Sequence, residues 1–487
     1  MMQNKKLWIS IAVFLIVSAL YFFFKIEYHE LWKDEWQPWL LARDKSLAHL
    51  LRFLHQEGHP ALWFCYLVPW ASISNSANFA PDQQVLLFEI AHGLLFVAAL
   101  AILLFRFQMP LLLRIATAGS FFFFYEYGIV NRGYMLLIVL SFLLFSLLKE
   151  KGKTGIAVAV LLFLICQTEV YGVFAAGGLF ICLWWDYYQK EGQVAFVNNK
   201  EMRRNAWALF SGVFVFVLTV FPRGTNKVVG LNTDALLIDN IAHSFQGNFA
   251  NAFWIGLIPD TNVFGYGAFG LVASLVLLGL VVAFFWRDKG LLVAFLVYML
   301  AAVVFGTYIY QGGVRHWGVN FIFFVGLVEL YFRRNGSLSK LQMGLIASFM
   351  LCQFYYNYLA IDKDLKYPFS NARITAAFIN EKIPTNVPIM AINKFETAPV
   401  VAYSGRTVYA LPTGEPFTYY QWLDKVYMPP EKELTIFAKY KKKSGLVILS
   451  PKPLNKDRYP NVELWKAFDG YNMKNENYYV YLLEAGK

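Results

Sequence analysis

Two adjacent acids, Asp34 and Glu35, follow the first long apolar segment of this sequence and stand between two tryptophans. Other ionisable side chains have similar positions, beside the ends of apolar segments: His59, Glu126, Arg132, Glu169, Arg223, Arg315 and His316. Ionisable groups within or beside a membrane are costly to keep, which makes them candidates for a functional site. A carboxylate can act as a general base, and arginine and histidine can bind an anionic leaving group.

One reaction suits a site with one essential carboxylate and several cations. When a sugar moves from a polyprenyl phosphate to a hydroxyl group, the leaving group is already a phosphate, which needs charge neutralisation rather than a proton. The accepting hydroxyl needs a general base, and an ordinary carboxylate is sufficient. Hydrolysis of a glycoside would instead require two carboxylates flanking the scissile bond. Neighbours in sequence usually point apart, so the acidic pair does not by itself indicate hydrolysis.

Each of these residues also has a structural interpretation. The acidic pair could be two solvated loop residues, and Arg132 or Arg223 could hold a loop at the lipid headgroups. His59 could begin the helix that follows it in the sequence. Glu169 is harder to explain in this way, because a carboxylate between two short apolar segments needs a partner or a cavity.

The composition places these residues in a polytopic membrane protein. Of the 487 residues, 58% are hydrophobic and only 15% are charged, which is more apolar surface than a water-soluble protein of this length needs. The net charge of +11 comes mostly from lysine and arginine at the ends of apolar segments, where orientation and anionic headgroups account for it. No nucleic-acid partner is therefore expected. The four cysteines lack the paired spacing of a disulfide framework or a metal site.

About eleven membrane-spanning segments are predicted. They cover residues 7–24, 85–105, two segments within 111–148, two short segments within 156–185 that meet at Glu169, 207–221, 269–286, 291–310, 317–332 and 341–361. Lysine and arginine lie at the inner turns of this topology, which puts the N-terminus inside and everything after Asp362 outside. Large outer loops are expected at 27–83, with one or two helices along the membrane face, and at 222–267.

The composition after Lys366 is that of a soluble domain of roughly 120 residues. Short β-like segments at 387–392, 446–449 and 478–483 alternate with helical stretches such as 372–382, a pattern that predicts a small α/β domain. The expected fold class is an α-helical polytopic membrane protein with a small C-terminal extracytoplasmic α/β domain. The expected division is a membrane domain of residues 1–361 and an outer domain of residues 362–487.

Three motifs occur where a known family has similar ones. The pair Asp34-Glu35 follows the first span, and His59-Pro60-Ala61-Leu62-Trp63 follows in the same outer loop. Asn131-Arg132-Gly133-Tyr134-Met135-Leu136 opens a later span, and Arg315-His316 stands in a late outer turn. Together they resemble the motifs of the polytopic GT-C glycosyltransferases, more narrowly the protein-mannosyltransferase/aminoarabinose-transferase-like group. Pro60-Ala61 departs from the Pro-Pro that many members of the family carry after the histidine.

The resemblance implies that Asp34 is the catalytic base. We expect Glu35 to orient it, and a divalent cation (Mg²⁺ or Mn²⁺) bound by Asp34 and Glu35 is an open alternative. The candidate ligands of the donor phosphate are Arg132, Arg315 and His316. Further candidates for the site are His59, Glu126, Glu169 and Arg223.

The sequence therefore predicts an integral membrane glycosyltransferase that moves a hexose or pentose from a polyprenyl-phosphate donor. The acceptor at the outer face is a glycan, a lipid or a protein, and the reaction is a single displacement with inversion. The expected location is the bacterial cytoplasmic (inner) membrane. The alternatives are a flippase or transporter of lipid-linked sugars and a non-catalytic membrane assembly protein. Transporters usually place ionisable groups near the bilayer midplane on broken helices, whereas these lie at outer ends beside long loops, which favours the enzyme.

Overall fold

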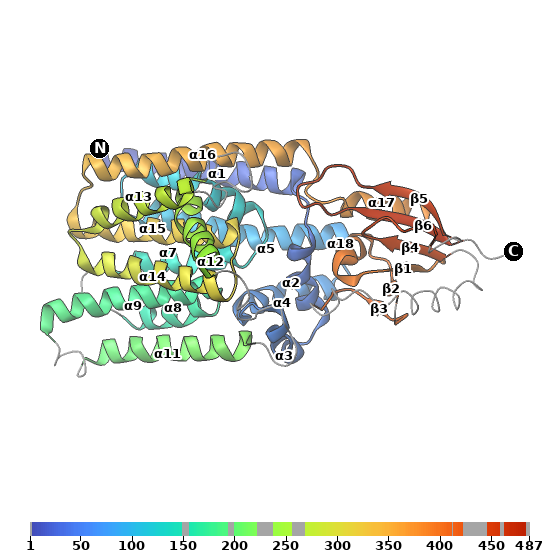
Figure 1. Cartoon of the computed structure of the whole chain (residues 1–487), viewed down its shortest axis with the longest axis horizontal. Coiled ribbons are helices and arrows are strands. Elements are labelled where there is room, and N and C mark those ends of the chain that lie inside the picture. The colour runs from blue at the N-terminus through green and yellow to red at the C-terminus, as the bar shows by residue number, and fades with distance from the viewer. Residues whose placement is uncertain are drawn as a thin grey trace. The chain divides into compact units, whose positions relative to one another are not determined.

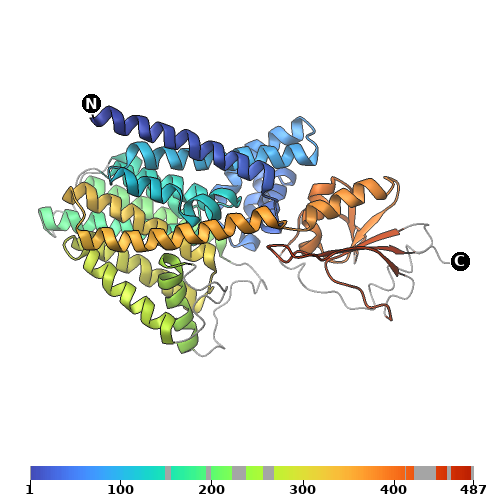
Figure 2. The same ribbon diagram turned by 90° about the horizontal axis from the view of Figure 1, so that it is seen from above.

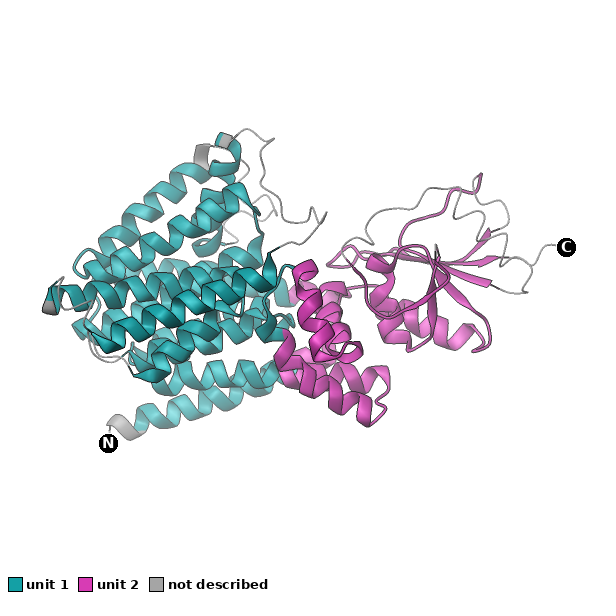
Figure 3. Cartoon of the chain, turned by 90° about the horizontal axis from the view of Figure 1, so that it is seen from below, with its two compact units in different colours: residues 1–23, 58–63, 92–361 teal, residues 24–57, 64–91, 362–487 magenta. Residues whose placement is uncertain are grey.

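The computed structural model describes residues 2–148, 155–192, 199–221, 237–255, 268–411, 413–421, 446–457 and 462–483. The chain forms two compact units, each assembled from segments far apart in the sequence (Figure 3). Unit 1 comprises residues 1–23, 58–63 and 92–361, and unit 2 comprises residues 24–57, 64–91 and 362–487. The predicted boundary after residue 361 falls where the last segment of unit 2 begins, but that unit also includes residues from the first outer loop.

Every predicted spanning segment corresponds to helical structure (Figure 1). The longer helices are α1 (Met2–Tyr28), α5 (Pro81–Ala101), α9 (Val170–Glu191), α11 (Lys200–Val220), α14 (Lys289–Tyr308), α15 (Val314–Asn335) and α16 (Lys340–Lys366). The shorter helices are α6 (Leu111–Ala118), α7 (Tyr134–Leu147), α8 (Ile156–Cys166), α12 (Leu237–Gln246) and α13 (Ala268–Phe285). Three π-helical segments adjoin them: η1 (Ile102–Arg106), η2 (Phe121–Ile129) and η3 (Gly247–Asn251).

Some of the described helices have the length and apolar side chains that a bilayer requires. Five of them are long and apolar enough to cross a membrane: residues 5–28, 81–106, 170–190, 289–308 and 340–366. Helices α1 and α16 leave large apolar side chains exposed, among them Trp8, Leu15, Leu351 and Tyr358. Such surfaces are stable against lipid rather than water. The predicted fold class, a helical polytopic membrane protein with a small C-terminal sheet, is confirmed.

Helix α15 is buried along most of its length in unit 1 because glycines let aromatic rings approach it. A Cβ atom added to Gly318 would lie 2.1 Å from Phe122 Cδ1, and one added to Gly326 would lie 2.0 Å from Phe145 Cε2. Small residues at such positions are the usual means of close helix packing in membranes. Figure 2 shows the helices of unit 1 from a second direction.

Ion pairs fix the end of α15 that carries the basic residues. The Arg334 guanidinium lies 2.6 Å from Asp186 Oδ2 and 3.0 Å from Asp288 Oδ1, which joins α15 to α9 and to the N-cap of α14. Glu329 accepts hydrogen bonds from the backbone N–H groups of Gln108 and Met109, both at 2.8 Å. These buried charges are each satisfied by several partners, as buried charges must be.

The first outer loop contains three helices, where one or two had been predicted. They are α2 (Lys33–Asp44), α3 (Leu47–Glu57) and α4 (Ala61–Ser76). Two breaks divide the stretch: α2 ends at the extended residue Lys45, and α3 is followed by Gly58, whose φ of +70° favours glycine. Pro60 then precedes α4, in keeping with the preference of proline for helix starts.

The C-terminal segment of unit 2 is a six-stranded mixed sheet of order β3-β2-β1-β4-β6-β5. Strands β1 (Ile389–Ala391), β2 (Val408–Ala410) and β4 (Leu446–Ser450) pair in parallel, and β3 (Pro416–Phe417), β5 (Val462–Phe468) and β6 (Tyr478–Leu483) pair antiparallel. Helices α17 (Ala372–Lys382) and α18 (Lys394–Ser404) pack together beside the sheet (Figure 2). Strands were predicted at 387–392, 446–449 and 478–483, and each prediction overlaps a strand.

Within unit 2, α2 packs against α18. The Leu31 N–H donates to Tyr403 Oη at 2.7 Å, and the Tyr403 hydroxyl faces the Leu31 carbonyl at 3.2 Å. The rings of Trp36 and Tyr403 meet edge to face, with centroids 5.0 Å apart. The first-loop helix that carries the acidic pair therefore shares a core with the C-terminal segment.

Candidate functional site

The acidic pair begins helix α2. Trp32 is the N-cap residue, so Asp34 and Glu35 lie in the first turn, where the helix dipole favours negative charge. Glu35 supplies one half of a capping box, because its Oε2 accepts a hydrogen bond from the Trp32 N–H at 3.3 Å. The Glu35 side chain is fully buried, whereas Asp34 is only partly buried.

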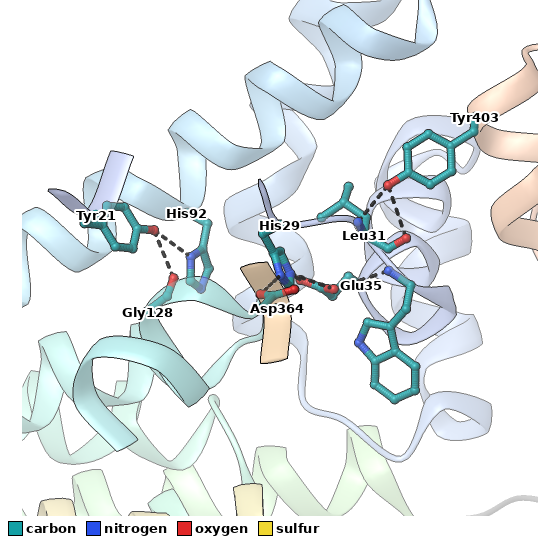
Figure 4. A network of polar contacts seen from close by, with 9 residues as sticks. Tyr21, His29, Leu31, Glu35, His92, Gly128, Asp364 and Tyr403 are labelled. Atoms are coloured by element: carbon teal, nitrogen blue, oxygen red, sulfur yellow. Dashed lines mark hydrogen bonds and ion pairs between the residues drawn. The ribbon is translucent and has the colours of Figure 1, made fainter. Parts of the chain in front are cut away.

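A buried histidine stands between Glu35 and a second carboxylate (Figure 4). His29 Nε2 lies 3.1 Å from Glu35 Oε1, and His29 Nδ1 lies 3.3 Å from Asp364 Oδ2. All three side chains are fully buried. Both ring nitrogens face carboxylates, so the ring donates from both, which only the charged imidazolium can do. Burial opposes that charge, but Glu35 and Asp364 together raise the pKa of His29 to about 9.

Further buried charges surround this group within unit 2. Lys25 and Glu89 are almost fully buried, and the charges of Glu89, Glu35 and Asp364 all act on Lys25. Two cations and three carboxylates thus compensate one another out of contact with water. Removal of a single member would leave an uncompensated buried charge.

The C-terminal segment holds the first turn of α2. Lys33 Nζ lies 2.7 Å from Glu396 Oε2, and the Lys33 N–H donates to Glu476 Oε1 at 3.3 Å. Glu476 also accepts a hydrogen bond from Ser370 at 2.7 Å. Burial raises the pKa of Glu476 to about 7, although Ser370 and Lys33 oppose the rise. The charge of Asp34 acts on Glu476 too, which places Asp34 close to it.

A second group of site candidates gathers in unit 1, around His316 in the first turn of α15. Arg132 lies in the break between η2 and α7, and the charges of Arg315, Arg132 and His59 all act on the His316 ring. Aromatic rings surround that histidine: the centroids of Tyr310, Tyr134 and Tyr171 lie 5.1, 6.0 and 6.2 Å from its own. The group is a cationic site enclosed by aromatic side chains.

The hydrogen bond to His316 determines which of its ring nitrogens can donate. The Gly313 N–H donates a hydrogen bond to His316 Nδ1, with the two nitrogens 3.0 Å apart. The neutral ring therefore carries its own hydrogen on Nε2. Gly312, with a φ of +76°, makes the turn before α15. His316 thus offers a neutral N–H donor beside two guanidinium groups, where the sequence had suggested a phosphate ligand without specifying its form.

Glu169 has the partner that its position in the sequence required. Residues 167–169 separate α8 from α9, as the two short predicted spans had implied. His59 Nδ1 lies 3.0 Å from Glu169 Oε2. The backbone between Arg132 and Tyr134 passes close by: a Cβ atom added to Gly133 would lie 3.1 Å from Trp63 and 3.3 Å from Glu169 Oε1.

The two remaining candidates from the sequence are Glu126 and Arg223. Glu126 is a partly buried residue of η2, and its charge acts on Tyr127 and Tyr356. The Tyr127 hydroxyl donates to the Arg315 carbonyl at 2.6 Å, so η2 supports the turn that carries Arg315. Arg223 lies outside the described residues.

For several residues, the sequence alone did not predict that they belong to these groups. His29 and Asp364 are 335 positions apart, and no local pattern relates them. Tyr171 follows Glu169 by two positions in the first turn of α9, a place that could have drawn attention to it. Its buried hydroxyl has no hydrogen-bond partner among the described residues, which is an unusual cost for a tyrosine.

The described residues offer no complete set of protein ligands for a metal ion. They include no group of three or more histidine, cysteine, aspartate or glutamate side chains that could hold an ion. Both oxygens of Glu35 face His29, and Oε2 also accepts from Trp32. The structure thus gathers His59, Arg132, Glu169, Arg315 and His316 in unit 1, and it places Asp34 and Glu35 in unit 2.

Comparison with known proteins supports the fold. No protein-family model and no curated protein matches the sequence. The crystal structure of ArnT from Cupriavidus metallidurans bound to undecaprenyl phosphate matches with a TM-score of 0.54 and 11% identity, covering 99% of this chain and 98% of that chain. The structure of the same protein in the apo state matches with a TM-score of 0.56 and 11% identity, covering 100% and 99%. The GT-C resemblance of the sequence motifs is confirmed at the level of the fold: along its whole length, this chain has the fold of the GT-C glycosyltransferase ArnT.

Proposed function

We propose that this chain is an integral membrane glycosyltransferase that transfers a monosaccharide from a polyprenyl-phosphate donor to an acceptor at the outer membrane face. The carrying observation is the group of cationic and aromatic side chains around His316, built from the residues of the Arg132 and Arg315 motifs. The fold of ArnT, one of whose structures contains undecaprenyl phosphate, supports the same class of ligand here.

In this proposal the group in unit 1 binds the phosphate of the donor. The guanidinium groups of Arg132 and Arg315 neutralise its charge, and arginine suits this task because it presents several donors in a fixed plane. His316 adds the Nε2–H donor that its bond to Gly313 leaves available. The Tyr171 hydroxyl, which has no hydrogen-bond partner among the described residues, adds another. The contact with His59 Nδ1, at 3.0 Å, fixes the position of the Glu169 carboxylate.

Asp34 acts as the general base. It takes the proton of the acceptor hydroxyl as that oxygen attacks the anomeric carbon of the sugar. The bond between that carbon and the phosphate oxygen breaks, and the polyprenyl phosphate leaves with the electron pair and one more negative charge. Arg132 and Arg315 stabilise this charge as it develops. A single displacement of this kind inverts the anomeric configuration.

Glu35 has no chemical step in this proposal, and no step passes through a metal ion. Both oxygens of the Glu35 carboxylate already face His29, which suits a structural role better than the binding of a metal ion. The acceptor is a glycan, a lipid or a protein. We place the chain in the bacterial inner membrane, with the N-terminus inside and residues 362–487 outside, on the distribution of lysine and arginine.

The test of function uses purified full-length protein and a panel of radiolabelled undecaprenyl-phosphate sugars, incubated with membrane extracts as the source of acceptor. Release of undecaprenyl phosphate together with a labelled product is the expected result. Because a general base contributes roughly 10²- to 10⁴-fold to such a step, Asp34→Asn should lower turnover by about that factor. Asp82→Asn, at an exposed carboxylate, is the matched control. Normal turnover by Asp34→Asn would refute the assignment of the base.

Donor binding can be measured separately with undecaprenyl phosphate itself, by quenching of tryptophan fluorescence. Arg132→Gln and Arg315→Gln should each weaken binding by about 10- to 100-fold, the usual cost of losing a charged hydrogen bond. Arg52→Gln, at an exposed residue of α3, is the control. Unchanged affinity in both variants would remove the phosphate site from unit 1. Binding without any turnover would favour a transporter of lipid-linked sugars.

A further inference from the structure

The buried contacts between Asp364, His29 and Glu35 have no part in the chemistry proposed above, yet they end one residue from Asp34. The two ring nitrogens of His29 bridge the carboxylates of Asp364 and Glu35 at 3.3 and 3.1 Å, with all three side chains fully buried. These residues come from the last turn of α16, the residue after α1 and the first turn of α2. Such a costly arrangement needs a reason beyond the filling of space.

Helix α2 begins where these contacts end. The N–H groups of Glu35 and Trp36 both donate to the Trp32 carbonyl at 3.0 Å, and the Trp32 N–H donates back to Glu35 Oε2. Glu35 therefore ties the N-cap to the first turn, and His29 holds Glu35 from outside the helix. The orientation of this turn decides where the neighbouring Asp34 carboxylate points.

We propose that His29 and Asp364 are positioning residues, which act through Glu35 to hold the first turn of α2 and with it the Asp34 carboxylate. The inference rests on the proposed function, because it gives Asp34 the role of base. It assigns Glu35 to the same task and explains why an acidic pair is found here: one acid is used for structure, and the other for proton transfer.

The other anchors of α2 lie further along the helix or at Lys33, whose side chain contacts Glu396 and whose N–H donates to Glu476. Gln37 Nε2 donates to Glu57 Oε1 and to the Tyr420 carbonyl, at 3.0 and 2.8 Å. These contacts keep the body of α2 in place without His29. Loss of the histidine should therefore loosen the first turn while the rest of the helix stays ordered, and a misplacement of about 1 Å at a reacting group can cost roughly 10²-fold in rate.

The charged groups that face His29 determine the range of pH over which its contacts with Glu35 and Asp364 are intact. They are Glu35 on α2, Asp364 on α16, and, at longer range, Glu30 beside it and Glu89 on α5. Lys25 on α1 shares the same carboxylates. Because Glu35 and Asp364 keep the imidazolium charged at neutral pH, the contacts should be complete under ordinary conditions and weaken in alkali.

The first experiment measures hydrogen exchange of backbone amides in the full-length purified protein and needs no substrate. His29→Gln should speed exchange in peptides that cover residues 32–38 by about tenfold, and peptides of α14 and α18 should be unchanged. His49→Gln, at an exposed histidine of α3, is the control. If His29→Gln does not fold, Asp364→Asn replaces it, because asparagine keeps the shape of the side chain and one hydrogen bond to the ring.

The second experiment measures kcat and KM for the donor of the panel that the wild-type chain turns over. His29→Gln should lower kcat by about 10- to 100-fold and leave KM for the donor within twofold. In the wild-type chain kcat should fall above about pH 9. Asp364→Asn should move that fall to lower pH, because one of the two carboxylates that favour the charged ring is gone.

The outcomes separate the two proposals. Unchanged exchange at residues 32–38 in His29→Gln overturns the positioning role, whatever the activity. Faster exchange with an unchanged kcat overturns it as well, because the first turn would then not matter for transfer. Normal turnover by Asp34→Asn, in contrast, refutes the assignment of Asp34 as the base, and the inference about His29 then fails for a different and recognisable reason. Absence of transfer by the wild-type chain refutes the proposed function itself.

Discussion

Adjacent carboxylates in α2 have contrasting surroundings. Consecutive helical positions point about 100° apart, so Glu35 faces the buried imidazolium of His29 while Asp34 stays partly exposed and close to Glu476. A buried, hydrogen-bonded acid fixes geometry, and a partly exposed acid can exchange a proton with a substrate. In our proposal the two residues share a sequence motif and have different roles.

The stability of unit 2 should depend on pH through two buried groups. Glu35 and Asp364, against the effect of burial, raise the pKa of His29 from 6.5 to about 9. The folded chain thus binds this proton more tightly than the unfolded chain. The resulting stabilisation is complete below pH 6.5 and is lost as the pH rises through 9. Burial raises the pKa of Glu476 from 4.5 to about 7, so its contribution is lost between those values.

We therefore expect the unfolding temperature to fall from pH 5 to pH 9. His29 and Glu476 each contribute about 3 kcal/mol to the expected change in the free energy of unfolding. Thermal unfolding monitored by near-UV circular dichroism, from pH 4 to pH 10, measures this. His29→Gln should flatten the alkaline part of the curve, and Glu476→Gln should flatten the acidic part. A stability that rises with pH over this range would contradict both pKa shifts.

Tyr171 provides a test of the donor site that leaves charge unchanged. Its buried hydroxyl has no partner among the described residues, so Tyr171→Phe should leave the unfolding temperature unchanged or raise it. The same change should weaken binding of undecaprenyl phosphate by about tenfold or more, if the hydroxyl donates to the phosphate. Tyr298→Phe is the control, because it removes a 2.7 Å bond to Asn320 and should cost stability instead. Equal binding by Tyr171→Phe and the wild type would exclude Tyr171 from the site.

At the scale of single elements, the glycines of α15 should be sensitive to substitution. Gly326→Ala would place a Cβ atom 2.0 Å from the Phe145 ring, and overpacking of this kind costs about 1 to 3 kcal/mol. Gly344 on α16 has no atom within 4 Å of the corresponding position, so Gly344→Ala should stabilise its helix by about 0.5 to 1 kcal/mol. Thermal unfolding in detergent compares the two variants. Equal effects would show that the close approach of Phe145 to α15 is relieved by small movements.

The spanning helices could be predicted because each has a strong local signal. An apolar run of sufficient length and a terminal lysine or arginine locate α1, α5 and α14 without reference to any other part of the chain. The division at Glu169 could be predicted for the same reason, since a carboxylate interrupts an apolar run. Strand β5, with exposed residues from Glu463 to Lys466, lacks such a signal. Its pairing with β6 depends on the completed sheet.

The site was predictable in part. Arg132, Arg315 and Glu169 stand at the ends of apolar segments, where charge is conspicuous, and the structure brings these residues near His316 or its neighbours. The roles of His29 and Asp364 depend on contacts between distant segments, which composition and periodicity do not encode. The sequence predicted that Glu35 orients Asp34, and the inference about His29 extends that prediction.

At the scale of the whole molecule, the orientation in the membrane is the central prediction. Single cysteines at exposed Lys382 and exposed Lys340 can be introduced into a variant whose four native cysteines are replaced. A membrane-impermeant maleimide added to intact cells should label Lys382→Cys, and it should label Lys340→Cys only after permeabilisation. The basis is the lysine and arginine at the inner turns. Labelling of both positions from the same side would contradict the topology.

The way in which unit 2 is assembled has a consequence for biosynthesis. Lys33 bonds to a residue 443 positions later, and His29 to one 335 positions later. A ribosome adds residues at roughly 5 to 20 per second, so α2 emerges well before Glu476 and must wait, for tens of seconds, without its partners. Contacts between such distant segments also form slowly. The helix that carries Asp34 thus reaches its final order only when synthesis is nearly complete, which keeps the partly made chain from presenting a finished acidic site.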